Sequence, residues 1–156
     1  MNSEVNALQS HRWAPHVTVA TVVERDGKVL LVEEHKVRGL VLNQPAGHLE
    51  PGETLAEAAV RETREESGWE VEITGLIGTY QWTAPDGKAF LRFAFAARPL
   101  AHHPDQPLDT GITQALWLTP TELQQSERLR SPLVWQVVQD WLGGQLHPLN
   151  VLKALP

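Results

Sequence analysis

The chain has 156 residues, of which 42% are hydrophobic and 21% are charged, with a formal charge of −6 at pH 7. This length can bury one sizeable core, so we expect a single domain over residues 1–156, with residues 1–14 as a flexible N-terminal arm. The negative charge argues against a nucleic-acid partner, and the lack of cysteine excludes disulfides, thiolate catalysis and cysteine-bound zinc.

The N-terminal segment, MNSEVNALQSHRW, has neither the apolar core of a secretion signal nor a membrane-spanning run. A cytoplasmic protein with no membrane partner is therefore expected. Two β-branched runs follow, at residues 16–25 and 28–34, joined through Asp26-Gly27. Because an Asp-Gly pair between such runs is a hairpin signal, this region predicts two antiparallel strands.

The centre of the chain predicts a helix over residues 54–67. Thr54 and Glu57 have the spacing of a capping box, which marks a helix start. Gly68 is placed to end the helix in a left-handed conformation. Six residues fall in one stripe of this helix, apolar at its start and acidic at its end: Leu55, Ala58, Ala59, Glu62, Glu65 and Glu66.

The acidic end of the stripe has two interpretations. It is a solvated face paired with Arg61 and Arg64, or it is a metal site. Like charges three and four residues apart repel, and carboxylates near a helix C-terminus oppose its dipole, so something must offset them. The glutamates continue the core-facing stripe, which favours the metal site. Ligands that are all oxygen suit Mg²⁺ or Mn²⁺.

The second half of the chain predicts another hairpin, a long loop, a short strand and a final helix. The loop contains three prolines, and its length is typical of a functional loop. The expected elements are strands at 70–82 and 88–98 around the turn Pro85-Asp86-Gly87, a loop at 99–111, a strand at 115–118, a helix start at 119–122 and a helix at 131–142 ended by Gly143-Gly144. This order predicts an α/β/α sandwich over a central mixed sheet.

Seven residues of the central region stand at the spacing G-x5-E-x7-R-E-x-x-E-E-x-G: Gly47, Glu53, Arg61, Glu62, Glu65, Glu66 and Gly68. This pattern is the Nudix box, and the chain resembles the Nudix (MutT-like) hydrolase family. Its likeness to the NudJ-type phosphatases extends over PHVTVA (15–20), NQPAGHLE (43–50), QWTAPD (81–86), LRFAFA (91–96) and LRSPLV (129–134). Thr63 stands where the box normally has an aliphatic residue, which we expect to alter packing and leave the metal site intact.

The resemblance implies a Nudix-type fold with a catalytic loop-helix-loop and a C-terminal helix. It also implies metal-assisted hydrolysis of a diphosphate bond by water. The matching metal ligands are Glu62, Glu65, Glu66 and the backbone carbonyl of Ala46. One glutamate would also act as the base, with Glu66, Glu65 and Glu62 as candidates in that order.

Four further box residues have structural parts in this scheme. Arg61 and Glu53 match the pair that braces the loop against the helix and orients the catalytic glutamates. Gly47 leaves room for the tight metal loop, and Gly68 ends the helix.

Five residues outside the helix are candidates for contact with a phosphorylated small molecule. Trp82 stacks on a ring of the substrate or lies in the core. Arg92 interrupts an apolar strand and faces solvent or, as we expect, a phosphate. Asn43 and Gln44 bind the substrate or are polar residues of an edge strand. Asp109 is an auxiliary ligand or base, or an exposed loop residue.

NudJ-type enzymes hydrolyse nucleoside di- and triphosphates and thiamine-pathway pyrophosphates, and this is the function the resemblance implies. Two alternatives share every box residue: a nucleotide-sanitising pyrophosphatase, and a hydrolase of nucleotide sugars or dinucleotides. An inactive ligand-sensing module is a third, opposed by the complete set of box glutamates. A monomer or a homodimer is expected.

Overall fold

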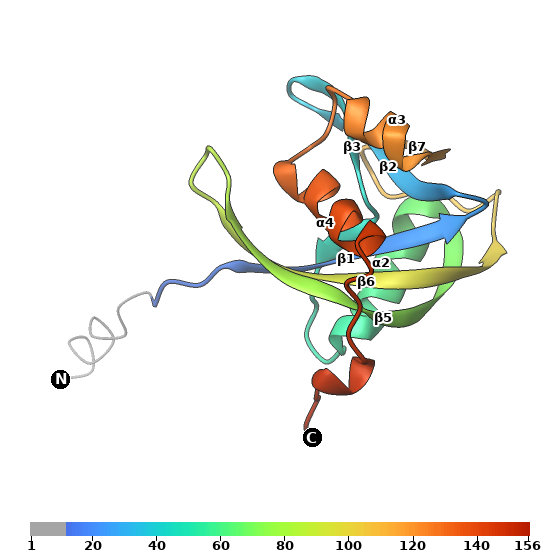
Figure 1. Cartoon of the computed structure of the whole chain (residues 1–156). Helices are drawn as coiled ribbons and strands as arrows, with labels where there is room; N and C mark the ends of the chain where they lie inside the picture. Colours follow the sequence, from blue (N-terminus) through green and yellow to red (C-terminus); the bar gives the residue numbers. More distant parts are fainter. Residues whose placement is uncertain (1–11) are drawn as a thin grey trace.

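The computed structural model describes residues 12–156, so most of the expected arm at residues 1–14 lies outside the described residues. The elements are β1 (His16–Arg25), β2 (Lys28–Lys36), β3 (Gly39–Asn43), β4 (Ala46–His48), α2 (Leu55–Ser67), β5 (Trp69–Thr83), β6 (Ala89–His102), β7 (Ile112–Leu118), α3 (Pro120–Gln125), α4 (Pro132–Leu142) and the 3₁₀ turn η1 (Leu149–Val151) (Figure 1).

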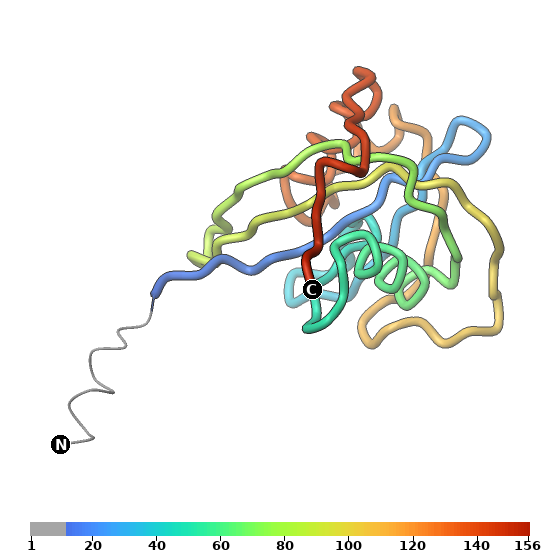
Figure 2. The backbone as a smooth tube through the Cα atoms, turned by 90° about the horizontal axis from the view of Figure 1, so that it is seen from below, coloured from blue at the N-terminus to red at the C-terminus, as the bar shows by residue number. Residues whose placement is uncertain are grey.

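The strands form a mixed sheet in the order β3-β2-β1-β6-β5. Strands β1 and β6 are parallel, whereas the other pairs are antiparallel, including β4 with β1 and β7 with β2. Strands β5 and β6 run side by side as a long hairpin, and the N-terminal part of β1 runs alongside it (Figure 2). The expected central mixed sheet is confirmed.

Helices α2 and α4 cover opposite faces of this sheet. Val19 and Phe95 pack with Ala58 and Ala59 of α2. On the other face, Val22, Ala94 and Ala96 pack with Val134, Val137 and Val138 of α4. Because successive residues of a strand point to opposite faces, β1 and β6 each contribute to both layers, and the α/β/α sandwich is confirmed.

Helix α2 begins and ends where the sequence predicts. The Thr54 hydroxyl accepts a hydrogen bond from the Glu57 backbone N–H, and the Thr54 N–H donates to the Glu57 carboxylate, each at 3.1 Å. Gly68 has a φ of 75° and its N–H donates to the carbonyl of Arg64. Both ends of the helix are therefore fixed by local contacts.

Several elements differ from the sequence-based expectation, among them β2, which ends at Lys36 rather than 34, and β7, which begins at Ile112 rather than 115. Strand β6 continues through the predicted loop start to His102, and Pro99 pairs with Val71 beside an irregularity in the ladder. Proline is tolerated there because a strand irregularity does not require its missing N–H. Strands β3 and β4 were not predicted, since five and three residues are too few to show a periodic pattern.

Within residues 12–156, no helix is both long and apolar enough to cross a bilayer. The expectation of a single domain over residues 1–156 stays a prediction.

Replacing Thr54 by alanine should destabilise the protein by about 1 kcal/mol, because the first turn of α2 loses its side-chain cap. Urea unfolding measures this change. Thr110→Ala, at an exposed turn, is the matched control and should change the free energy of unfolding by less than about 0.5 kcal/mol. Equal stabilities of the Thr54→Ala and Thr110→Ala proteins would contradict the role of the cap.

Candidate active site

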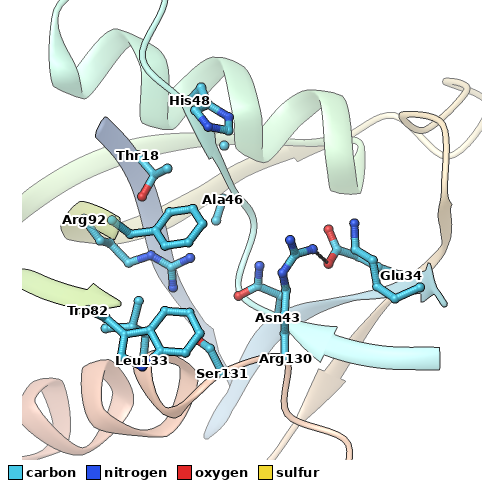
Figure 3. A pocket seen from close by; sticks show the side chains of 13 residues that line it. Thr18, Glu34, Asn43, Ala46, His48, Trp82, Arg92, Arg130, Ser131 and Leu133 are labelled. Carbon is cyan, nitrogen blue, oxygen red and sulfur yellow. Dashed lines mark hydrogen bonds and ion pairs between the residues drawn. The ribbon is translucent and has the colours of Figure 1, made fainter. Parts of the chain in front are cut away.

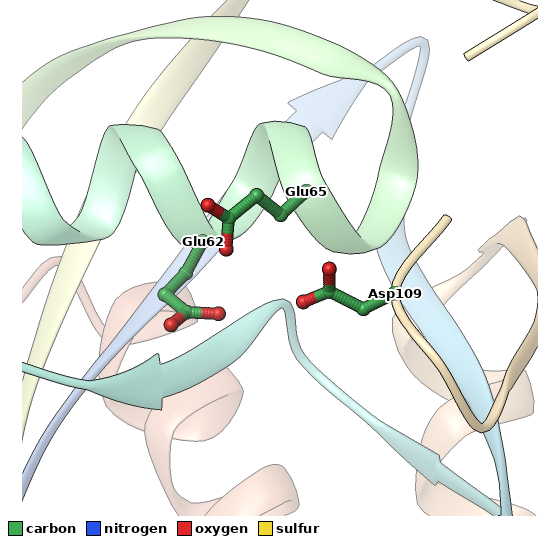
Figure 4. A group of neighbouring side chains, drawn as sticks. All are labelled: Glu62, Glu65 and Asp109. Carbon is green, nitrogen blue, oxygen red and sulfur yellow. The ribbon is translucent and has the colours of Figure 1, made fainter. Parts of the chain in front are cut away.

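Three carboxylates meet beside the last turns of α2. Glu62 and Glu65 lie on one face of the helix, and Asp109 approaches them from the loop between β6 and β7 (Figure 4). One carboxylate oxygen from each residue lies within 4.8 Å of those of the other two. The structure thus places Asp109, an exposed loop residue, next to two of the predicted metal ligands.

The loop that carries Asp109 is fastened to the end of α2 by hydrogen bonds to the helix. The N–H of His103 donates to the carbonyl of Gly68 at 2.8 Å, and the Asp109 N–H donates to the carbonyl of Glu65 at 3.0 Å. Between them, the Gln106 amide donates to the carbonyl of Arg64 at 2.7 Å. The last carbonyls of a helix lack a following turn to bond them, so the loop donates to those of Glu65 and Gly68, shares that of Arg64 with the Gly68 N–H, and positions Asp109 in doing so.

Glu66 lies beside this group of three and is bonded to β4. Its side chain is buried, and its carboxylate accepts a hydrogen bond of 2.7 Å from the N–H of Ala46. Burial raises the pKa of Glu66 to about 8, helped by the negative charges of Glu34, Glu62 and Asp109 and opposed by the Ala46 N–H. Glu66 therefore joins α2 to the start of β4, where the backbone carbonyl of Ala46 is the expected fourth metal ligand.

Arg61 connects the helix to the loop before it. Its guanidinium makes two hydrogen bonds to Glu53, at 2.6 and 2.9 Å, and one to the carbonyl of His48 at 3.0 Å. It also donates to Glu62 at 2.8 Å and to Glu65 at 3.1 Å. The bond from Arg61 lowers the pKa of Glu53, and burial raises the pKa of Glu62. This geometry fits the expected brace.

Gly47 lies directly against the Glu62 carboxyl group. A Cβ at this position would lie 2.1 Å from the carboxyl carbon of Glu62, which is far inside van der Waals contact. Only glycine allows β4 and α2 to approach each other this closely.

A cavity of about 230 Å³ opens on the other side of the Ala46–Gly47 backbone (Figure 3). Three of the predicted substrate contacts, Trp82, Arg92 and Asn43, line it. Gln44 does not line the cavity. It is buried, donates to the carbonyl of Val134 at 2.6 Å and accepts a bond of 3.4 Å from Arg92.

The cavity also contains residues that sequence reasoning missed, among them Thr18, Phe90, Glu34 and Arg130. Arg130 reaches it because residues 128–130 pair with Leu42: the Leu42 N–H donates to the carbonyl of Arg128 and the Arg130 N–H to that of Leu42. Its guanidinium then donates to Glu34 at 2.5 Å. The only signal in the sequence was that Arg130 falls in LRSPLV, one of the segments that carried the resemblance.

The donors around the carboxylate cluster are all oxygen atoms, from Glu62, Glu65, Asp109 and the nearby Glu66. Such a set suits a hard divalent cation, which carboxylates and carbonyls bind in preference to softer ligands. Arg61 is the one cation bonded to the glutamates of α2 within residues 12–156, and one positive charge does not balance them. The residues present therefore fit a divalent metal.

Comparison with known proteins gives one consistent answer. The model of the NUDIX domain matches residues 13–137. The chain is 47% identical over 141 residues to Phosphatase NudJ of Escherichia coli strain K12, covering 90% of this chain and 92% of that protein. A NUDIX hydrolase from Nitrosomonas europaea superposes with a TM-score of 0.88 at 43% identity, covering 91% of this chain and 98% of that chain. A C. elegans Ap4A hydrolase, at 19% identity, shares the fold with a TM-score of 0.65, over 83% of this chain and 96% of that chain.

Gly47→Ala should lower turnover by roughly 100-fold, because its methyl group displaces the Glu62 carboxylate by at least an ångström. Steady-state kinetics on a hydrolysed phosphate ester or anhydride measure this loss. Gly143→Ala is the control, since a Cβ there meets only ordinary contacts at 3.4 Å or more. Full activity of Gly47→Ala would disprove the close packing of β4 on α2.

The stability of the protein in a chelator should depend on pH through Glu66. Its pKa is about 8 in the folded protein against 4.5 as the ordinary value, so between these the folded protein holds one proton more than the unfolded chain. The stabilising contribution of Glu66 is complete below pH 4.5. It decreases as the pH rises, by up to about 1.4 kcal/mol per pH unit, and is lost once the pH has passed the folded-state pKa of about 8.

Urea unfolding at several pH values between these limits measures the slope. Glu66→Gln should remove most of it, because glutamine does not titrate. Glu127→Gln removes an exposed carboxylate and should preserve it. An unchanged slope in Glu66→Gln would show that another group carries the titration.

Proposed function

The chain belongs to the Nudix hydrolase family, and from this premise we propose that it cleaves phosphoanhydride bonds with the help of a divalent cation, Mg²⁺ or Mn²⁺. The observation that carries the proposal is the convergence of Glu62, Glu65 and Asp109 at the Ala46–Gly47 backbone, with the cavity on its other side. The diphosphate would lie at this junction, and the rest of the substrate would lie in the cavity.

Each carboxylate has a part in this mechanism. Glu62, Glu65 and Glu66, with the Ala46 carbonyl, would hold the metal, and Asp109 would add a ligand from the loop. When bound, the cation would lower the pKa of the attacking water and neutralise charge on the leaving phosphate. Glu66, Glu65 and Glu62 remain candidates for the base in that order. Arg61 and Glu53 would keep the glutamates in place.

For the substrate we propose nucleoside di- or triphosphates or thiamine-pathway pyrophosphates. The identity of 47% to Phosphatase NudJ supports this class, and the aromatic wall of Trp82 and Phe90 supports a substrate with a ring. A nucleotide-sanitising enzyme and a hydrolase of nucleotide sugars or dinucleotides are the alternatives. The cytoplasmic location and the monomeric or homodimeric state stay predictions.

A panel of diphosphates assayed with Mg²⁺, scoring phosphate against pyrophosphate release, tests this function. We expect turnover of ring-bearing diphosphates, its loss in EDTA, and its recovery on addition of Mg²⁺ or Mn²⁺. Glu66→Gln should lower kcat by about 10²- to 10⁴-fold. Glu127→Gln is the matched control and should behave as the unaltered protein.

Two results would contradict the proposal. Turnover that persists in EDTA would remove the metal from the mechanism. An active Glu66→Gln protein would overturn the assignment of this glutamate.

A further inference from the structure

Arg92 is a buried cation with too few partners. Its side chain is 8% exposed, in the middle of β6. A guanidinium carries five N–H donors. Among residues 12–156, its one hydrogen bond is to Gln44, at 3.4 Å, and its Nε has no partner. Unfilled donors on a buried charge are costly, so this side chain is suited to a ligand that supplies acceptors.

Two more buried polar groups at the same cavity lack partners. The Thr18 hydroxyl and the Asn43 amide oxygen are unpaired, and both side chains are at most 5% exposed. Thr18 and Arg92 are direct neighbours in the β1–β6 register, so their side chains share one face of the sheet. Three of the four unpaired buried atoms within residues 12–156 thus belong to residues lining this cavity. Unpaired buried groups are rare, and their concentration here indicates a recognition surface.

One part of the remaining wall of the cavity is apolar, whereas Lys36, His48, Arg130 and Ser131 belong to another part. The rings of Trp82 and Phe90 stack with centroids 5.9 Å apart and 23° between their planes, and Leu133 lies with them in the lining. The apolar part offers a phosphate no hydrogen-bond donor. A planar ring gains from it, so the ring of the substrate is the part that fits here.

The hydrogen-bonding polarity at the buried part of the cavity is set by Arg92, because Lys36, His48, Arg130 and Ser131 are more exposed. Glu34, the carboxylate of the lining, already bonds Arg130 at 2.5 Å. Thr18 and Asn43 each have donors and acceptors and adapt to either kind of partner. A guanidinium donates only, so the atom that faces Arg92 must be an acceptor. An amino group at that position would face the guanidinium with a second hydrogen-bond donor, and no hydrogen bond would form between them.

We propose that Arg92 determines specificity by reading an oxygen on the ring, so that substrates with a ring carbonyl are favoured over matched substrates with an amino group at the same position. This revises the expectation that Arg92 binds a phosphate, and it rests on the diphosphate hydrolysis proposed above. Of the substrates proposed there, nucleotides of uracil, hypoxanthine or guanine carry such an oxygen at C4 or C6, where cytosine and adenine carry an amino group, and the rings of thiamine carry no ring oxygen.

The test compares kcat/KM for uridine against cytidine triphosphate, inosine against adenosine triphosphate, and a methyl diphosphate with no ring. The unaltered protein should prefer the oxo member of each pair by about tenfold or more. Arg92→Met should lower kcat/KM for the oxo substrates by about tenfold to a hundredfold, while the amino substrates and the methyl diphosphate stay within about threefold. Arg98→Met, at an exposed position of the same strand, is the control and should change none of these values.

Three results would overturn the inference. Equal rates for the two members of each pair in the unaltered protein would do so without any variant. An equal loss on all substrates in a folded Arg92→Met protein, with folding checked by thermal unfolding, would assign Arg92 to the phosphates. If no diphosphate is hydrolysed, the methyl diphosphate included, the proposed function itself fails and this inference fails with it.

Discussion

The structure depends on the close approach of β4 to α2. Gly47 lies against the Glu62 carboxylate, the Ala46 N–H donates to Glu66, and the His48 carbonyl accepts from Arg61. Three consecutive residues of a short strand are thus tied to one helix. The same three residues pair with residues 18–20 of β1, so the helix, the metal loop and the sheet form one frame. A side chain at position 47 would push β4 and α2 apart at the point where they are closest.

This frame explains how a helix can bear carboxylates at its C-terminal end. Repulsion among Glu62, Glu65 and Glu66 and the helix dipole both act against the arrangement. Arg61 offsets part of the charge, and the loop before β7 fills the last carbonyls of the helix with backbone and amide donors. The pKa values of Glu62 and Glu66 are nevertheless raised, first of all by burial, which a divalent cation beside them would counteract.

The parts of the site that could be predicted from the sequence are those set by local contacts. Helix α2 has its start in Thr54 and Glu57 and its end in Gly68, and spacing alone places Glu62 and Glu65 on one face. The sequence offered Asp109 as an auxiliary ligand or base or as an exposed loop residue, and could not decide between them, because its position depends on bonds from its loop to α2. Thr18 lies beside Arg92 only through the parallel register of β1 and β6, and Arg130 reaches the cavity only through the pairing of residues 128–130 with Leu42. These placements join segments far apart in the chain, so no local pattern reports them.

The partner of Arg92 shows why the cavity and the carboxylate cluster can have separate tasks. A carboxylate beside this guanidinium would fill its donors and neutralise it, leaving nothing for a ligand. Gln44 instead is held by the Val134 carbonyl at 2.6 Å and makes only a long bond of 3.4 Å, so it orients Arg92 without saturating it. Burial lowers the pKa of Arg92 to about 10, which still leaves it charged at neutral pH. Because Gln44 and Val134 belong to the α4 side of the sheet, changes there can alter ring recognition while Gly47 and the glutamates of α2 keep the bond-breaking site intact.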